Sequence, residues 1–147
     1  MLRILTPLGN RPIKATYMAS EAMYQGMAVS LDTANAEVDK ATGVGDYIVD
    51  VPKSYTGLYA IVNPEDDAFE SIASGTIVNV IPAYIGDRFA TDQITTTGLS
   101  TGDPLDVADG LFIEATSTDS YQYIYGGTYA DPTGTLHIVE RVAKATV

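Results

Sequence analysis

Short turn sequences built from glycine, aspartate and proline recur along the whole chain and separate short apolar stretches. Residues 98–116, GLSTGDPLDVADGLFIEAT, are a clear case, because the turns STGDP and VADG bracket residues 105–107 and 111–115. Glycine adopts positive φ angles, and an aspartate side chain bonds to the backbone two residues further on. Turns at this spacing, separated by β-branched and aromatic residues, predict a β-barrel or β-sandwich.

The apolar stretches between the turns predict the strands. The longest of them, residues 75–85, is apolar on both faces, which fits a strand buried on both sides, and Pro82 marks an edge, a bulge or a change of partner. Two weak helix signals occur, at residues 18–25 with Ser20 as the cap and at residues 64–73. We expect strands over residues 13–18, 26–32, 45–51, 57–63, 75–85, 111–116, 121–127 and 135–142.

Charge is spread unevenly along the 147 residues, which carry a net charge of −11. Residues 1–20 hold three basic residues and no acidic one, whereas residues 21–134 hold 18 acidic residues against three basic ones. Such an acidic body repels nucleic acid and anionic membranes, so we expect neither as a partner. The chain has no cysteine, and no apolar run approaches the roughly 18 residues of a membrane-spanning helix.

Residues that carry catalysis or bind metals are scattered. His137 is the only histidine, and its place in a predicted strand favours a surface position or a hydrogen-bonded core position. Asp103, Asp106 and Asp109 are three residues apart, but the glycines and the proline among them argue against a shared helical face. They also lack the alternate spacing and the final glutamate of a calcium loop. We predict no catalytic residue, no metal and no cofactor, and we expect that the protein is not an enzyme.

Tyrosines gather in the stretch YQYIYGGTY, which holds Tyr121, Tyr123, Tyr125 and Tyr129. In a strand the first three share one face, because alternate side chains point the same way. Such a row forms core packing, a protein interface or a stacking platform for glycans. These three readings stay open, and the four tyrosines are our candidates for a subunit interface.

Several stretches follow one another in a familiar order: YQGMAVSLD, VGDYIVDV, GLYAIVNPEDD, GTIVNVI, GLSTGDPLDVADGLFIEAT and YGGTYADPTGTLHIVERV. This order resembles that of the small capsid decoration, or cement, proteins of tailed bacteriophages, over most of residues 13–142. Residues 98–116 are similar to the family's G-D-x-L-x-V-x-x-G-x-[FL] stretch, and residues 84–94 to a segment of phage head proteins. The resemblance implies a β-barrel or β-tulip, a terminal arm on the capsid lattice, and frequent trimers.

We therefore predict a small all-β domain over residues 13–147, a β-barrel or β-tulip with at most one or two short helices. The expected protein is a virion component on the outer capsid surface, which binds the major capsid protein and stabilises contacts between capsomers. Self-association into a homotrimer is also expected. The alternatives are a glycan- or receptor-binding module of a phage fibre, with the tyrosines as its platform, and a tail-tube or connector subunit.

An extended arm over residues 1–12 precedes the predicted domain. Pro7, Gly9 and Pro12 exclude a regular helix or a central strand there. Its apolar residues would be poorly covered in a free arm, so we expect them to order only against a partner, and we expect deletion of residues 1–12 to leave the domain folded. The residues expected to bind the capsid are Leu2, Arg3, Ile4, Leu5, Leu8 and Arg11.

We expect EDTA to leave the melting temperature of the protein unchanged, because isolated carboxylates at turns hold a cation only weakly. Scanning calorimetry with and without the chelator measures this. A fall of many degrees that added calcium reverses would show that the acidic turns bind a cation.

Overall fold

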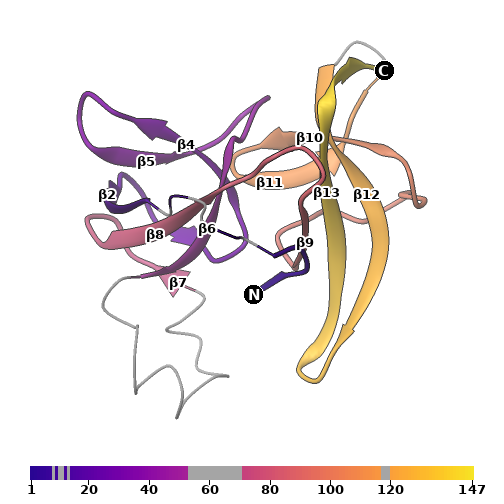
Figure 1. Ribbon diagram of the computed structural model, residues 1–147, viewed down its shortest axis with the longest axis horizontal. Coiled ribbons are helices and arrows are strands. Elements are labelled where there is room, and N and C mark those ends of the chain that lie inside the picture. Colours follow the sequence, from indigo (N-terminus) through magenta and orange to yellow (C-terminus); the bar gives the residue numbers. More distant parts are fainter. Residues whose placement is uncertain (8, 10–11, 13, 53–70, 117–119) are drawn as a thin grey trace.

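A closed five-stranded barrel and an open six-stranded sheet divide the chain between them (Figure 1). The computed structural model describes residues 1–7, 9, 12, 14–52, 71–116 and 120–147. Every regular element within these residues is a β-strand, so the predicted all-β fold with a small barrel is confirmed. The described residues contain no helix long and apolar enough to cross a membrane.

The barrel is built by strands from the N-terminal part of the chain. Its members are β2 (Lys14–Ala19), β4 (Ala28–Asp32), β5 (Glu37–Lys40), β6 (Tyr47–Pro52) and β8 (Ile77–Pro82). They close in the order β2-β5-β4-β6-β8, and β2–β5 is the one parallel pair among these neighbours. The short strands β3 (Met23–Tyr24) and β7 (Ser71–Ile72) form a separate antiparallel pair.

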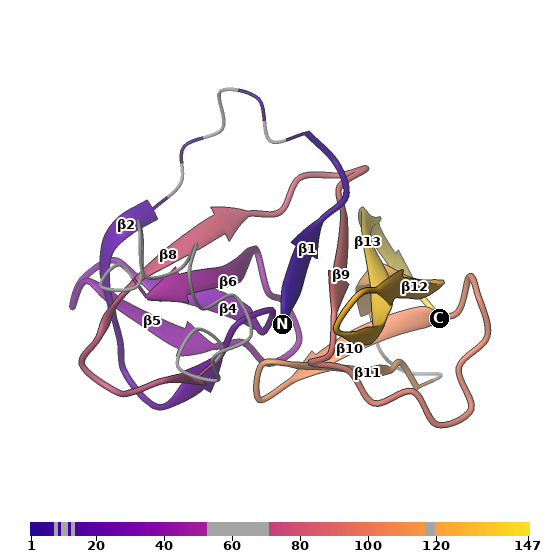
Figure 2. The same cartoon turned by 90° about the horizontal axis from the view of Figure 1, so that it is seen from below.

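The open sheet combines the C-terminal part of the chain with one strand from the N-terminus. Its strands are β1 (Leu2–Ile4), β9 (Arg88–Thr91), β10 (Pro104–Ala108), β11 (Leu111–Glu114), β12 (Ser120–Asp131) and β13 (Gly134–Thr146). They pair antiparallel in the order β1-β9-β13-β12-β10-β11. Figure 2 shows β1 beside β9, with the long β12–β13 hairpin beyond it.

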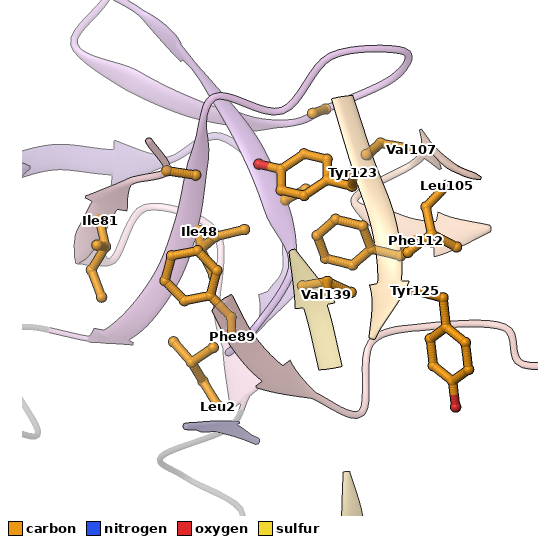
Figure 3. Close-up of a cluster of buried hydrophobic side chains, with 13 residues drawn as sticks. Leu2, Ile48, Ile81, Phe89, Leu105, Val107, Phe112, Tyr123, Tyr125 and Val139 are labelled. Carbon is orange, nitrogen blue, oxygen red and sulfur yellow. The ribbon is translucent and has the colours of Figure 1, made fainter. Parts of the chain in front are cut away.

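Both faces of the barrel wall next to the sheet are buried, because successive residues of a strand point to opposite sides. Ile48 and Ile81 join the core between the barrel and the sheet (Figure 3). Their neighbours Val49 and Val80 belong to a second cluster, which joins the barrel strands with β3 and β7. The prediction that the strand within residues 75–85 is buried on both sides is therefore confirmed for the last three residues of β8, whereas Ile77 at its start is exposed. Pro82 is its last residue, beyond which the chain leaves for the sheet.

Residues 18–25 form the end of one strand, a turn and a second short strand, so the predicted two helical turns are wrong. The Ser20 hydroxyl, expected to cap a helix, instead donates to the Val38 carbonyl oxygen at 3.0 Å. This bond holds the end of β2 against β5, and it leaves Met23 1% exposed in the barrel cluster. Residues 57–63 and 64–70, where a strand and most of a second helix were predicted, lie outside the described residues.

The N-terminal residues belong to the sheet, which corrects the prediction of an arm that orders only against a partner. β1 pairs with β9, so that Leu2 lies opposite Thr91 and Ile4 opposite Phe89. Leu2 is 5% exposed and packs in the core beside Phe89 (Figure 3). Pro7, Gly9 and Pro12 argue against a central strand, but β1 lies at the edge of the sheet and ends before Pro7, so this restriction does not apply to it.

A charged contact secures β1 to the far hairpin. Arg3 Nε donates to the Asp131 carboxylate at 2.7 Å, close to the tip between β12 and β13. Leu5 packs against the cluster that contains Leu136, and Ile4 remains 38% exposed. Two further residues of the predicted capsid-binding arm, Leu8 and Arg11, lie outside the described residues.

Replacing Leu2 with alanine should lower the free energy of unfolding by about 2–5 kcal/mol, because a buried side chain is lost and a cavity remains. The matched control is Ile4→Ala on the same short strand, where the exposed side chain should change the value by about 0.5 kcal/mol. Urea denaturation measures both. Equal, small losses would mean that β1 does not pack on the sheet in solution.

Candidate functional site

Tyr123 lies in the contact between the sheet and the barrel. Its side chain is 1% exposed, and its ring packs edge-on against Phe112 with 5.0 Å between the ring centroids. The hydroxyl donates to the carbonyl oxygen of Gly45, in the segment that leads into β6. Arg141 Cζ lies 5.0 Å from the centre of the Tyr123 ring, and Arg141 Nη1 donates to the hydroxyl at 3.1 Å. Tyr123 thus joins the two parts of the molecule.

Arg141 extends this junction to the barrel backbone. Its Nη1 donates to the Gly45 carbonyl oxygen at 2.8 Å, and its Nη2 donates to the Asp46 carboxylate at 2.8 Å. Glycine is needed at position 45 because a Cβ atom there would lie 2.7 Å from the Cβ atom of Ala28. Burial raises the pKa of Tyr123 to about 12, although the nearby Arg141 charge acts in the opposite direction.

The only histidine pairs with the next tyrosine along the same strand. The Tyr125 hydroxyl and His137 Nδ1 are 3.0 Å apart, across the β12–β13 ladder. Tyr125 is 7% exposed and His137 is half-buried. The prediction of a surface or hydrogen-bonded core histidine is confirmed, since its ring has a hydrogen-bond partner inside the chain.

The structure corrects the prediction of a subunit interface for two of the four tyrosines, whereas for Tyr121 and Tyr129 it stays a prediction. Tyr123 and Tyr125 are buried within this chain, so they are not available to a neighbouring one. Tyr121 is half-buried, and Tyr129 packs against the cluster around Leu136. Register shifts between Tyr121 and Tyr123, and after Tyr125, interrupt the regular alternation of the strand. The sequence identified the shared face but carried no signal that the barrel covers it.

Asp103 and Asp109 make turns, as predicted, whereas Asp106 lies within β10 opposite Ile113, which corrects the prediction of a turn there. The Asp103 carboxylate accepts a hydrogen bond from the backbone N–H of Ser100 at 2.6 Å. Asp109 and Gly110 form the two-residue turn of the β10–β11 hairpin, and both have positive φ angles, as a type I′ turn requires. Among the described residues, no three His, Cys, Asp or Glu side chains are grouped so that they could hold a metal ion.

A tight turn at the start of the sheet presents apolar side chains to solvent. The N–H of Asp87 donates to the Tyr84 carbonyl oxygen at 2.9 Å, and Gly86 at the third position has a φ of 93°. These features define a type II turn, in which the third residue needs positive φ. Ile85 occupies the second position and is 71% exposed, and Tyr84 beside it is 48% exposed.

Hydrogen bonds from two other elements hold this turn in place. The N–H of Gly86 donates to the Arg141 carbonyl oxygen, and the N–H of Arg141 donates to the Asp87 carbonyl oxygen, both at 2.8 Å. On the barrel side, the N–H of Ala83 donates to the Asp46 carbonyl oxygen at 2.9 Å. The buried Asp87 carboxylate also accepts from the N–H of Tyr84 at 2.6 Å. In the sequence, residues 84–94 are notable only for their resemblance to phage head proteins, and this turn was not predicted as a site.

A second exposed apolar place lies on the barrel. Met18 of β2 and Ile77 of β8 face each other across the ladder and are 41% and 40% exposed. The described surface of this acidic chain thus presents several exposed apolar side chains, among them those of the Tyr84–Asp87 turn and of this pair.

No family model matches the chain, and no curated protein or solved structure matches it either.

The stability advantage of the wild-type protein over the variant Tyr123→Phe should shrink as the pH rises from about 10 to about 12. Tyr123 stays protonated in the folded protein up to about pH 12, whereas an unfolded tyrosine ionises near pH 10, so unfolding becomes easier in that window. The full shift corresponds to about 2–3 kcal/mol. Urea denaturation of both proteins from pH 7 to 12 measures the difference, and a constant difference would contradict the burial of the hydroxyl.

Proposed function

We propose that this chain is a structural virion protein that binds the outside of an assembled phage capsid and holds neighbouring capsomers together. Its partner in this proposal is the major capsid protein. The resemblance of the chain's turn-and-strand segments to capsid decoration proteins supports the class of protein. The observation that carries the proposal is that the Met18–Ile77 pair and the Tyr84–Ile85 turn are separate exposed apolar places on one body with a shared core.

A protein that links two neighbours needs two contact surfaces held at a constant separation. Ile77 lies at the start of β8, and Ile85 follows its other end by three residues. At about 3.3 Å per residue in an extended chain, the eight steps between them span at most about 25 Å. Because β8 is packed on both faces between these points, the separation does not depend on a flexible joint.

The charge of the chain supports a protein partner rather than nucleic acid or an anionic membrane. Its net charge of −11 opposes approach to phosphates, which carry the same sign. A capsid surface with basic side chains would be attracted instead, and many copies on a lattice would add avidity to individually weak contacts.

The other functions considered have less support. A glycan-binding module would need exposed tyrosines as its platform, but Tyr123 and Tyr125 are buried. No contact in the described residues favours a tail-tube or connector subunit. The homotrimer stays a prediction that rests on the resemblance, because Tyr123 and Tyr125 are not available as its interface.

Purified protein should co-sediment with expanded shells that lack it and raise the temperature at which those shells dissociate. Oligosaccharides should not compete. The variant Ile77→Asp should lower the affinity for shells about tenfold, because it places a charge in an apolar contact, whereas Thr97→Asp adds the same charge to an exposed polar loop and should have no effect.

Binding to a glycan array together with failure to sediment with shells would replace this proposal with the receptor-binding function. Circular dichroism of both variants controls for folding.

A further inference from the structure

The most exposed large apolar side chain in the described part of the molecule is Ile85, at the apex of the Tyr84–Asp87 turn. Covering an isoleucine side chain that water surrounds is worth about 1.5–3 kcal/mol, so a partner that encloses it gains affinity. Single exposed apolar residues are common on protein surfaces and need no explanation. Ile85 differs because of its neighbours and its backbone.

One further apolar side chain accompanies Ile85. The β6–β8 ladder pairs Tyr47 with Pro82, and the bond from the N–H of Ala83 to the Asp46 carbonyl oxygen continues it beyond both strands. This bond places Asp46 next to the segment that leads into the turn. Tyr84 is 48% exposed, so Tyr84 and Ile85 together form a short apolar ridge at the turn.

The backbone beneath this ridge is already ordered before any partner binds. The turn is held by hydrogen bonds with three groups: the backbone of β13, the Asp46 carbonyl oxygen and the buried Asp87 carboxylate. Binding then requires little loss of conformational freedom, which is one of the main costs of forming an interface. A rigid apolar apex of this kind has the properties of an interface hot spot.

The charges around the ridge indicate the kind of partner. The Asp46 carboxylate is 61% exposed beside it, while the Arg141 side chain that contacts Asp46 is only 11% exposed. Arg88 and Glu140 lie further along and pair with each other at 3.6 Å. The accessible charge next to the ridge is therefore negative, as is the chain as a whole.

We propose that the Tyr84–Ile85 ridge docks on a cationic protein surface, with Ile85 inserted into an apolar pocket and basic side chains of the partner beside Asp46. A second copy of this chain is a poor occupant, because it would bring two bodies of net charge −11 together. This inference rests on the proposed function, since it identifies the surface that contacts the shell.

The test uses empty expanded shells assembled from the major capsid protein without this chain. The variant Ile85→Asp should lower the affinity for shells by about thirtyfold or more, as loss of a hot spot does. Its melting temperature should stay the same, because the side chain is exposed. Gly86→Ala keeps the isoleucine but strains a residue with a φ of 93°, so it should weaken binding several-fold. Ile85→Leu should restore binding, and Thr97→Asp is the charge control.

The outcomes separate this inference from the proposed function. If the wild-type protein does not sediment with shells, the proposed function fails. If it does and Ile85→Asp binds as well as Thr97→Asp, the ridge is not the contact and this inference alone fails.

Wild-type affinity should fall as NaCl rises from about 50 to 500 mM. An affinity that is insensitive to salt would contradict a cationic partner. Conversion of an oligomer to a monomer by Ile85→Asp, seen by analytical ultracentrifugation, would identify a second copy as the occupant and overturn it too.

Discussion

One residue, Arg141, connects the packing of the two β layers to the exposed turn. Its guanidinium group donates to Gly45 and Asp46 on the barrel side and lies over the ring of Tyr123. Its backbone N–H and carbonyl group bond to the turn that carries Ile85. Because both sets of bonds belong to one residue of β13, the layers cannot shift relative to each other without disturbing the turn. The rigidity of the apolar ridge is therefore a consequence of how the core is closed.

Local patterns in the sequence were sufficient for those parts of the fold that depend on neighbouring residues. The Asp109–Gly110 turn forms because glycine and aspartate tolerate positive φ, and the strands on both sides of it follow from alternation. β8 was recognisable because residues that are apolar on both faces have only one stable environment, inside two packed layers. In each case the physical cause lies within about ten residues.

Features that depend on distant contacts could not be read from the same patterns. The row of Tyr123 and Tyr125 has one face whether that face meets a partner or the chain's own barrel, and periodicity does not distinguish the two. Leu2 likewise carries no sign that it pairs with Thr91, far along the chain. The turn at Ile85 was missed for a related reason, since its rigidity comes from Asp46 and Arg141, which belong to other elements.

The side chains of β8 and those of the turn that follows it differ in how much the fold depends on them. Ile81 is fully buried, so its size and shape are determined by the surrounding core. Four residues later Ile85 packs in none of the buried clusters, and the turn around it is maintained by backbone bonds and by Gly86 and Asp87. The stability of the chain therefore places almost no demand on the side chain at position 85. In the docking that we propose, an isoleucine beside Tyr84 at this position serves the contact with a partner and not the fold.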